Sequence, residues 1–415
     1  MSERRRVVVT GIGAMTPLGL TLDETWDGLL KGESGIGPIT QFDASGLPSQ
    51  IAGELKGFDP ADYIEYKEAR RMARCSQVAL ATAKEAVADA GLVVPLEDGE
   101  GVGTLIGSGV GGFERALEGV DIYREKGLRR LSPFVPISML INMPSYHVST
   151  WSGAKGPIST VAAACATGTQ AVGEGAEHIR RGAADVMICG GVDAMVHFTL
   201  VVGFCAMRAL STRNDEPERA SRPFDVDRDG FVLSEGAAVF VLEELGHARA
   251  RGARIRAEVR GHSSSSDAYH VAQPDPDGEG GQRAMTWALE DAQVEPRDVD
   301  YINAHGSATP ISDPIETLAI KQVFGDHAYE VPISSTKSMI GHPMGGAGAI
   351  EAAVCVRTIE DGMIHPTANL EKPDPACDLD YVPGSAREAD VSVALSNSFG
   401  LGGQNACLVL GRFEE

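Results

Sequence analysis

The sequence predicts an α/β protein built in two similar halves, each with a mostly parallel sheet that is covered by helices. Short apolar runs typical of buried strands alternate with longer stretches of helical spacing along the 415 residues. Because parallel strands are joined by crossover connections, this alternation favours helices on the faces of the sheet. A similar succession of motifs occurs twice in the same order, which indicates an internal duplication.

The first half supplies the clearest elements. Residues 7–10 and 102–106 are predicted strands, because each is a short run rich in apolar residues. Residues 74–91 have apolar side chains at helical spacing and end in a glycine, which predicts a helix. Residues 168–181 are predicted to form a helix rich in small residues, and residues 185–189 the strand that follows it.

Several parts of the first half have counterparts in the second. Helix 79–90 resembles residues 284–292, and each is followed by a strand and a loop. The other pairs are 157–160 with 332–335, 168–182 with 345–362, and 230–233 plus 238–242 with 393–395 plus 407–410. No long linker separates the halves, and residues 249–257 are the candidate join. We therefore expect halves of residues 1–252 and 253–415, packed into one body.

The overall charge and the cysteines narrow the class of protein. The chain carries 58 acidic and 36 basic residues, a formal net charge of -22, so it is a poor generic binder of nucleic acid. Seven cysteines without a CxxC pair fit neither a disulfide framework nor a zinc site, and they indicate a reducing compartment. The apolar run at residues 7–9 is too short for a signal sequence, and no long apolar stretch is present. These features favour a cytoplasmic protein without a membrane segment.

One cysteine stands where a strand-like segment meets a helix rich in small residues. Cys165 lies in the string V-A-A-A-C-A-T-G, at residues 161–168. A thiol at a helix N-terminus has a lowered pKa and is a better nucleophile. A lone cysteine is more often a buried structural residue, and that interpretation fits Cys189, Cys205 and Cys355, which lie in apolar runs.

Two further loops at predicted strand ends carry basic residues. The string N-A-H-G-S-A-T-P presents His305, and S-T-K-S-M-I-G-H-P presents Lys337 and His342. Each histidine alone could be structural. Three separate strand-end loops that offer cysteine, histidine and lysine plus histidine favour a catalytic site, because active sites of α/β proteins are built at strand ends.

Two other motifs are weaker. Residues 107–112 satisfy G-x-G-x-x-G after a strand, but no acidic residue at a following strand end clearly completes a dinucleotide site. Residues 225–230 resemble the start of a calcium loop, but the position that requires glutamate is Gly236. We therefore expect no calcium site there.

Four short strings occur in the order of one known family. They are A-L-S-T-R-N-D at 209–215, S-R-P-F-D at 221–225, R-D-G-F at 228–231 and N-S-F-G at 397–400. Together with the three loops, they make the chain resemble the β-ketoacyl-acyl-carrier-protein synthases, particularly the type II elongating enzymes, of the thiolase-like superfamily. The resemblance covers nearly the whole chain. It implies a homodimer whose subunits have a thiolase-like fold, with two duplicated, mixed five-stranded sheets and helices in a layered αβαβα arrangement.

The chemistry of that family maps onto residues of this chain. By resemblance, Cys165 accepts an acyl group from acyl carrier protein, and its own N–H and that of Phe399 form an oxyanion hole. His305 and His342 match the pair that binds the malonyl thioester carbonyl and supports decarboxylation. The resulting enolate attacks the acyl group on Cys165. The resemblance implies no metal or redox cofactor, because loss of carbon dioxide generates the nucleophile.

The resemblance also assigns supporting roles. Lys337 matches a lysine that orders the site, and Glu351 and Asp313 match its acidic neighbours. Ser307 and Thr309 match hydroxyls that contact the phosphopantetheine arm of the acyl carrier protein.

Other matches concern access to the site and docking. Phe399 matches a gating side chain, and Val110, Phe134 and Phe204 match positions in the acyl pocket, although each could be a plain core residue. The basic positions that match a docking surface for the acidic carrier protein are Lys67, Arg70, Arg71, Arg129, Arg130 and Arg208. The alternative for any one of them is an ordinary solvated charge.

The expected activity is a decarboxylative Claisen condensation of malonyl-acyl carrier protein with an acyl group held on Cys165, which gives 3-oxoacyl-acyl carrier protein in fatty-acid elongation. The alternative is a ketosynthase of polyketide or specialised lipid biosynthesis, which keeps the same site. A thiolase is disfavoured because its usual second cysteine is not evident. A non-catalytic chain-length factor is disfavoured because Cys165 is present, and only the glycine motif supports an oxidoreductase.

Overall fold

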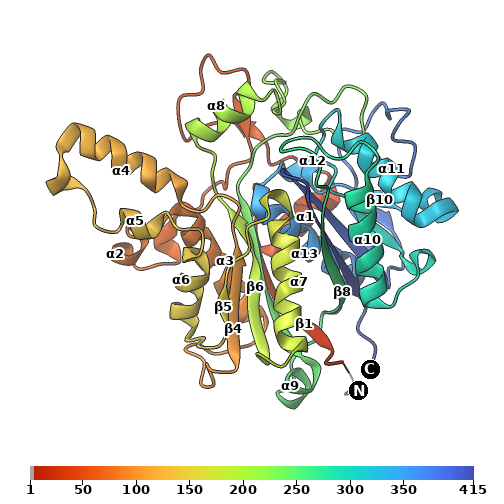
Figure 1. Cartoon of the computed structure of the whole chain (residues 1–415), viewed down its shortest axis with the longest axis horizontal. Coiled ribbons are helices and arrows are strands. Elements are labelled where there is room, and N and C mark those ends of the chain that lie inside the picture. The colour runs from red at the N-terminus through yellow and green to blue at the C-terminus, as the bar shows by residue number, and fades with distance from the viewer. Residues whose placement is uncertain (1–3) are drawn as a thin grey trace.

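The computed structural model describes residues 4–415 and contains five layers in the order helix, sheet, helix, sheet, helix (Figure 1). The strands of the first sheet layer are β1 (Val7–Met15), β4 (Val102–Gly107), β5 (Ile158–Ser159), β6 (Val186–Asp193) and β7 (Gly236–Glu244). Those of the second layer are β8 (Ala257–Ser266), β9 (Tyr301–Asn303), β10 (Ile333–Ser334), β13 (Val393–Gly400) and β14 (Gln404–Gly411). Two short ladders lie outside these layers and pair β2 (Gly37–Pro38) with β3 (Ile51–Ala52), and β11 (Met363–Ile364) with β12 (Arg387–Glu388).

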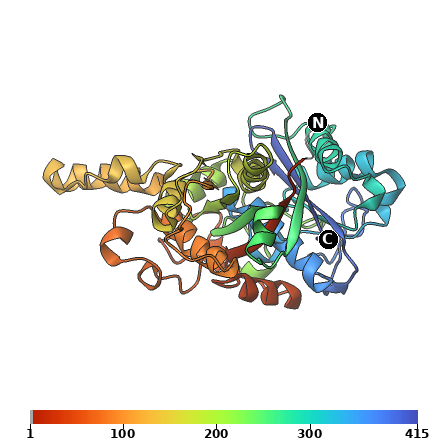
Figure 2. The same ribbon diagram turned by 90° about the horizontal axis from the view of Figure 1, so that it is seen from below.

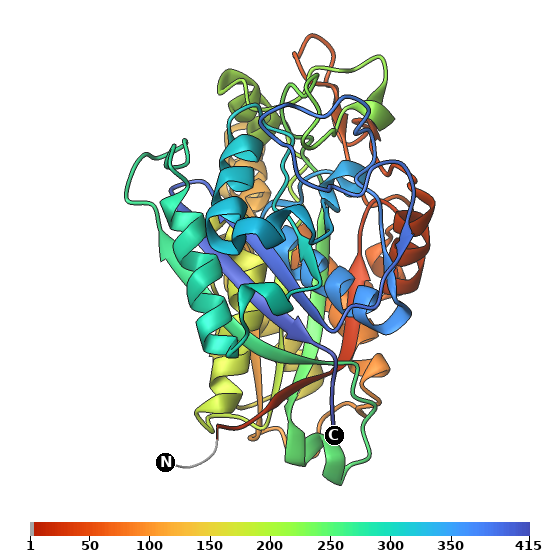
Figure 3. The ribbon, with the colours of Figure 1, turned by 90° about the vertical axis from the view of Figure 1, so that its right-hand side faces the viewer.

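Helices cover both outer faces and fill the space between the sheets. The first layer is covered by α3 (Arg74–Asp89) and α6 (Met143–Ser152), and the second by α10 (Glu279–Ala292) and α11 (Ser312–Phe324) (Figures 1 and 3). Between the layers lie α7 (Thr167–Arg180) and α13 (Ala347–Asp361). The shorter or peripheral helices are α1 (Leu22–Lys31), α2 (Tyr66–Ala69), α4 (Phe113–Lys126), α5 (Val135–Ser138), α8 (Phe198–Ala206), α9 (Leu245–Ala250) and α12 (Lys337–Ile340).

Both sheet layers have the same topology, which confirms the duplicated, mixed five-stranded arrangement. The strand orders are β5-β4-β6-β7-β1 and β10-β9-β13-β14-β8. In each layer the first three strands are parallel and the last two join antiparallel. The layers are also connected directly, because Val8 and Val9 of β1 pair with Glu258 and Ala257 of β8. The ten strands therefore form one continuous sheet that folds around the central helices.

One proposed pair of repeated segments is wrong. Residues 230–233 were expected to correspond to residues 393–395, but the strand equivalent to β13 is β6. The apolar run of residues 230–233 lies outside the main sheet and makes only isolated bridges, from Phe231 to Leu210 and from Leu233 to His342. Its backbone groups bond to loops near the functional site, so its apolar side chains are buried there and not in a sheet.

Glycines allow close packing at two places in the core. A Cβ on Gly11 of β1 would lie 2.2 Å from the carbonyl oxygen of Ala86, so glycine lets α3 lie directly on this strand. A Cβ on Gly168 of α7 would lie 2.5 Å from the amide nitrogen of Ala349 in α13. The small residues that predicted a helix at 168–181 thus serve the contact between the two central helices.

One part of the chain extends away from the layered body. Helix α4 projects with its loops at the side of the first sheet layer, beside α5 (Figures 1 and 2). Several apolar side chains on this projection are exposed, including Leu128 at 72%. Within residues 4–415, none of the helices combines the length and the apolarity that crossing a membrane requires.

Candidate functional site

The three predicted loops converge on one cavity of about 360 Å³. The predicted residues that line this cavity are Cys165, Phe204, Arg208, His305, Ser307, Thr309, His342 and Phe399. The cysteine comes from the first half of the chain, and both histidines come from the second. The cavity therefore lies at the boundary between the two repeated units.

Cys165 sits in the 3₁₀ turn η3 (Ala164–Ala166), which leads directly into α7. The turn is strained, because Ala164 has a φ of 48° although it carries a side chain. The hydroxyl of Thr167 stabilises it by accepting a hydrogen bond from the Ala163 amide at 2.8 Å and donating to the Ala164 carbonyl at 2.7 Å. A Cβ on Gly400 would lie 3.2 Å from the Cys165 amide nitrogen, so the end of β13 lies close to this backbone.

The thiol of Cys165 is protonated at rest. Its helix N-terminus predicts a lowered pKa, but burial raises the pKa of the Cys165 thiol to about 11. A backbone hydrogen bond from Leu401 and the charge of Lys337 oppose this increase. The loss of hydration of the thiolate outweighs both, because the side chain is buried among apolar residues.

His305 and His342 are neutral bases whose rings approach each other edge to face, with centroids 5.5 Å apart. Burial lowers the pKa of both imidazoles well below its ordinary value, and the charge of Lys337 lowers both further. Among residues 4–415, Nδ1 of His305 and both ring nitrogens of His342 have no hydrogen-bond partner. These nitrogens are therefore available to a molecule that enters the cavity.

Lys337 lies behind the two histidines and is buried in the first turn of α12. Its ammonium group donates to the carbonyl oxygen of His305 at 2.7 Å and pairs with the carboxylate of Glu351. Burial raises the pKa of Glu351, and the nearby ammonium opposes this effect. The ammonium of this buried ion pair therefore lies against the loop that carries His305.

The two predicted acidic neighbours of Lys337 have different environments. Glu351 contacts the lysine, whereas Asp313 accepts a hydrogen bond from the Phe224 amide at 2.9 Å and lies 3.6 Å from the guanidinium of Arg228. Burial raises the pKa of Asp313 to about 6. Asp313 thus supports the loop that contains Phe224.

Sequence reasoning missed Glu316, which holds the loop that carries His305. Its carboxylate accepts hydrogen bonds from the amides of His305 and Gly306, both at 2.8 Å. Burial raises the pKa of Glu316 to about 7. The available signal was spacing, because Asp313 and Glu316 lie three residues apart on α11 and so share a face of that helix.

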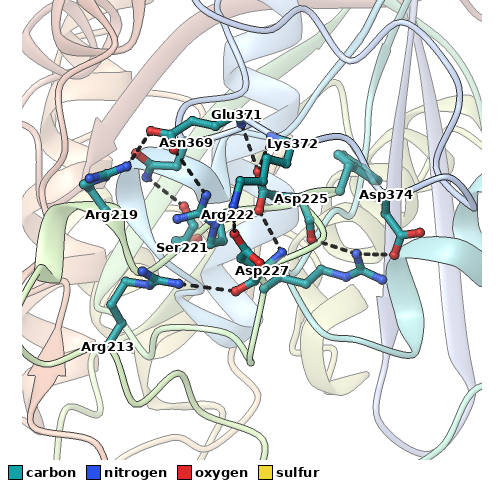
Figure 4. Close-up of polar contacts among 12 residues, drawn as sticks. Arg213, Arg219, Ser221, Arg222, Asp225, Asp227, Asn369, Glu371, Lys372 and Asp374 are labelled. Atoms are coloured by element: carbon teal, nitrogen blue, oxygen red, sulfur yellow. Dashed lines mark hydrogen bonds and ion pairs between the residues drawn. The ribbon is translucent and has the colours of Figure 1, made fainter.

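The S-R-P-F-D string forms part of a polar network that connects loops from the two halves (Figure 4). Asp225 accepts hydrogen bonds from the Glu371 and Lys372 amides at 2.9 and 2.8 Å, and from Arg222. Ser221 donates to the backbone carbonyl of Lys337 at 2.6 Å. The network therefore supports the turn that carries the buried Lys337. It also uses the carboxylate of Asp225, the first residue of the calcium-like string, for hydrogen bonds within the protein.

The glycine motif at residues 107–112 does lie between a strand and a helix, but its amides are already bound. The buried carboxylate of Asp193 accepts hydrogen bonds from the Gly109 and Val110 amides at 3.0 and 3.3 Å, and from the Ser108 hydroxyl at 2.6 Å. In a dinucleotide site, such amides face a pyrophosphate. Their use by an internal carboxylate removes the structural basis for an oxidoreductase.

Phe399 lies at the end of β13, where its ring is tilted over His305 at a centroid distance of 5.9 Å. The ring also packs on α10, because a Cβ on Gly281 would lie 3.1 Å from Cζ. The loop that follows contains Gly402 and Gly403 in left-handed conformations, with φ of 83° and 69°. The position of this ring is compatible with the predicted gate, which stays a prediction.

The predicted pocket residues divide into two groups. The ring of Phe204 stacks edge to face with Phe231 at 5.3 Å, and Phe231 contacts His342 in the same way at 5.4 Å, so an apolar wall continues from the thiol. Val110 and Phe134 do not line the cavity of their own chain. Phe134 is 37% exposed beneath the guanidinium of Arg71.

The predicted docking residues also occupy two places. Arg208 follows α8, is exposed and lies at the cavity. The others are on or beside α2 and in the 3₁₀ turn η2 (Leu128–Arg130), next to α4 and α5. They are Lys67, Arg70, Arg71, Arg129 and Arg130. In Figure 1, α8 is at the top and α2 at the left, so the predicted positions do not form one compact patch around the cavity.

Comparison with known proteins agrees with this geometry. Residues 4–248 match the family model of the β-ketoacyl synthase N-terminal domain, and residues 256–371 that of the C-terminal domain. The chain is 48% identical over 412 residues to a 3-oxoacyl-[acyl-carrier-protein] synthase 2 from Synechocystis sp., covering 99% of both chains. It is 47% identical over 414 residues to the protein of that name from Staphylococcus aureus, covering 100% of both.

Solved structures with the same fold include two ketosynthases. The ishigamide ketosynthase/chain length factor superposes with a TM-score of 0.92 at 37% identity, covering 99% of this chain and 100% of that one. A β-ketoacyl synthase from Burkholderia phymatum gives 0.91 at 38% identity with the same coverage. The chain belongs to the β-ketoacyl synthase family.

Proposed function

We propose that the protein catalyses the decarboxylative condensation of malonyl-acyl carrier protein with an acyl group on Cys165, giving 3-oxoacyl-acyl carrier protein in fatty-acid elongation. This activity makes it an acyltransferase. The observation that carries the proposal is one cavity in which a nucleophilic thiol meets two neutral imidazoles with free ring nitrogens. The names of its relatives support the same substrate class.

The first half-reaction transfers the acyl group. The sulfur of Cys165 attacks the acyl thioester, and its proton passes to an imidazole nitrogen in the cavity. The imidazolium then gives that proton to the departing phosphopantetheine thiolate and is neutral again. The amides of Cys165 and Phe399 stabilise the tetrahedral oxyanion. The apolar wall that includes Phe204 and Phe231 accommodates the acyl chain. Because burial raises the pKa of the resting thiol, an imidazole that accepts its proton assists the attack.

The second half-reaction forms the carbon–carbon bond. Neutral His305 and His342 donate hydrogen bonds to the malonyl thioester carbonyl, and the charge that develops there when carbon dioxide leaves is stabilised. The resulting enolate carbon attacks the acyl carbonyl, and the tetrahedral intermediate expels the thiolate of Cys165, which takes up a proton from water. Loss of carbon dioxide supplies the electron pair, so we propose no resident metal or redox cofactor.

Lys337 tunes this second half-reaction. Burial lowers the pKa of both imidazoles and the positive charge of Lys337 lowers it further, so they remain neutral N–H donors at physiological pH. The hydrogen bond from Lys337 to the His305 carbonyl also fixes the loop. Ser307 and Thr309, whose hydroxyl oxygens lie 3.3 Å apart on the cavity wall, would contact the phosphopantetheine arm.

The proposed partner is an acyl carrier protein. One similar solved structure is described as a type II polyketide acyl-carrier protein in complex with its ketosynthase, and this chain matches it with a TM-score of 0.91 at 34% identity. The position of Arg208 at the cavity supports a role in docking. An acidic partner suits local basic groups even though the chain carries a net charge of -22.

We also propose a homodimer in the cytoplasm. The edge strand β5 has both residues exposed, with Ile158 at 53%, and apolar side chains of α4 to α6 are exposed beside it. An unpaired edge next to an apolar patch is typical of an interface. Phe134, which precedes α5 on this face, does not line the cavity of its own chain, so we propose that it contacts the partner subunit. All seven cysteines are free thiols, which suits a reducing compartment.

A condensation assay tests the function. Malonyl-acyl carrier protein is supplied with saturated acyl primers of graded length, and the products are weighed by mass spectrometry. Chain-extended linear 3-oxoacyl products support the proposal. Failure with every saturated primer contradicts it and favours the second candidate, a polyketide ketosynthase, which the likeness to the type II PKS ketosynthase in complex with its acyl-carrier protein suggests.

A further inference from the structure

A buried polar network lies behind the two strand ends that carry His305 and Lys337. Its members are Tyr301, Asn303, Ser334, Thr336 and His365, and all five are completely buried. They come from three segments, because the first two belong to β9, Ser334 ends β10 and Thr336 directly precedes α12, and His365 follows β11. None of the roles proposed above uses this network.

His365 has a defined proton arrangement in the network. Its Nδ1 lies 2.9 Å from the carbonyl oxygen of Pro366, and a carbonyl only accepts, so Nδ1 carries the hydrogen. In the neutral ring Nε2 is therefore an acceptor. It lies 3.0 Å from the hydroxyl of Thr336 and 3.3 Å from that of Ser334. Burial lowers the pKa of His365 to about 4, which agrees with a neutral ring.

The other hydrogen bonds run toward that acceptor. The Asn303 amide group donates to the hydroxyls of Tyr301 at 3.1 Å and Thr336 at 2.9 Å. Each of these hydroxyls therefore keeps its own proton to donate, Thr336 to His365 and Tyr301 to Ser334 at 2.7 Å. Ser334 then donates to His365. Every hydroxyl both accepts and donates, and Nε2 of His365 is the final acceptor.

The network connects the two segments whose relative position matters for the site. Asn303 precedes His305 by two residues, and Thr336 directly precedes Lys337. The same two segments pair as parallel strands, with Ser334 opposite Asn303, and meet again in the hydrogen bond from Lys337 to the His305 carbonyl. A shift between these segments would move the ammonium relative to the imidazole.

We propose that His365 is a positioning residue that fixes Lys337 relative to His305 by accepting hydrogen bonds from Thr336 and Ser334. The inference rests on the proposed condensing function. It predicts a selective effect, because decarboxylation depends on His305 and Lys337, whereas Cys165 is carried by a separate turn in the other half of the chain.

The test compares His365→Leu with His365→Gln in two separate assays, release of carbon dioxide from malonyl-acyl carrier protein and transfer of an acyl group to Cys165. We expect His365→Leu to slow decarboxylation about tenfold to a hundredfold, because a small misplacement of catalytic groups has effects of this size. Acyl transfer should stay within about twofold of the wild type. The Gln variant should recover most of the lost rate, since its amide can accept from Thr336 and donate to Pro366.

A second pair of variants tests Thr336, the donor of the hydrogen bond to His365. Thr336→Val should show the same selective loss, and the double variant His365→Leu/Thr336→Val should be less impaired than His365→Leu, because donor and acceptor are removed together. Thr358→Val is the matched control, since the buried hydroxyl of Thr358 has no hydrogen-bond partner in the part of the chain that the structure describes.

Each outcome decides the matter. Equal loss of both half-reactions in the variants, or a Gln variant no better than Leu, overturns the positioning role. If His365→Leu does not fold, His365→Gln and Thr336→Val give the decision. A wild-type chain that is inactive in both assays contradicts the proposed function instead.

Discussion

The two halves of the molecule share one backbone design where their central helices begin, but only one half places a nucleophile there. The turn η3 precedes α7, and the turn η7 (Met344–Gly346) precedes α13. The first residue of each turn is left-handed, with φ of 48° at Ala164 and 44° at Met344. The next residue is Cys165 in the first half and Gly345 in the second. The duplicated scaffold thus supplies the same strained turn twice, and the side chain at one position determines which copy carries the acyl group.

A second correspondence concerns the loops after β4 and β9. In each half a buried carboxylate accepts hydrogen bonds from two successive amides of that loop, Asp193 from Gly109 and Val110, and Glu316 from His305 and Gly306. Only the second loop carries a basic side chain. The comparison indicates that the fold provides turns and clamps in both halves, while the nucleophile and the decarboxylating groups are divided between them.

The largest effect is expected from removing the nucleophile in the first half. Cys165→Ala should lower condensation by at least about 10³-fold, because Cys165 is the one thiol among the described residues that line the cavity. Transfer of a labelled acyl group to the protein should disappear, while the far-ultraviolet circular dichroism stays unchanged. Cys205→Ala is the control for general effects of a lost thiol. Full condensation activity in Cys165→Ala would contradict the assignment of Cys165 as the nucleophile.

The next effect tests whether His305 serves decarboxylation and not acylation of Cys165. His305→Ala should slow decarboxylation about 10²- to 10³-fold, because it removes one donor to the developing enolate. Acylation of Cys165 should fall much less. The two steps are measured separately with malonyl and acyl thioesters, and His327→Ala, at a histidine outside the cavity, is the matched control. An equal loss in both steps contradicts this division.

A pH effect is expected from the clamp in the second half. The pKa of Glu316 is about 7 in the folded chain, above its ordinary value, so the folded state binds a proton that the unfolded state has released. Stability should therefore decrease as pH rises from about 4.5 to 7, by on the order of 3 kcal/mol from this group. Glu316→Gln should flatten that decrease, which urea unfolding at several pH values measures. An unchanged slope would show that Glu316 does not titrate in this range.

The smallest effect is expected at Gly345, the residue of the second half that corresponds to Cys165. A Cβ on Gly345 would lie 2.6 Å from the Gly109 amide nitrogen and 2.8 Å from Asp193, so Gly345→Ala should lower the free energy of unfolding by about 1–3 kcal/mol. Gly203→Ala is the control, because nothing lies within 4 Å of its added Cβ. Equal stability of the two variants in urea would mean that the second turn tolerates a side chain.

The alternation of strands and helices predicted helix-covered sheets, and the repeated order of motifs predicted the duplication, whereas the mixed strand directions followed only from the family resemblance. The loops at strand ends predicted that Cys165, His305 and His342 meet. The role of Glu316 was not predicted, because its carboxylate accepts hydrogen bonds from backbone amides, which do not depend on the identity of the residues that donate them. The predicted direction of the thiol pKa was also wrong, since the helix terminus is a local feature whereas burial depends on the surrounding chain. Residues 230–233 were paired with residues 393–395 for a similar reason, because apolar composition does not distinguish a sheet from a loop packed beside a cavity.

The two halves are held together by the pairing of β1 with β8 and by one covalent connection, between β7 and β8. The connection between β7 and β8 consists of α9 and a short loop with an exposed, left-handed Gly252, and none of these residues lines the cavity. A single cut in that loop would leave one fragment with the thiol and another with both imidazoles. Neither fragment alone could turn over, so recovered condensation would report how well the two pieces find each other again. The condensation activity of the two fragments would thus measure their reassembly directly.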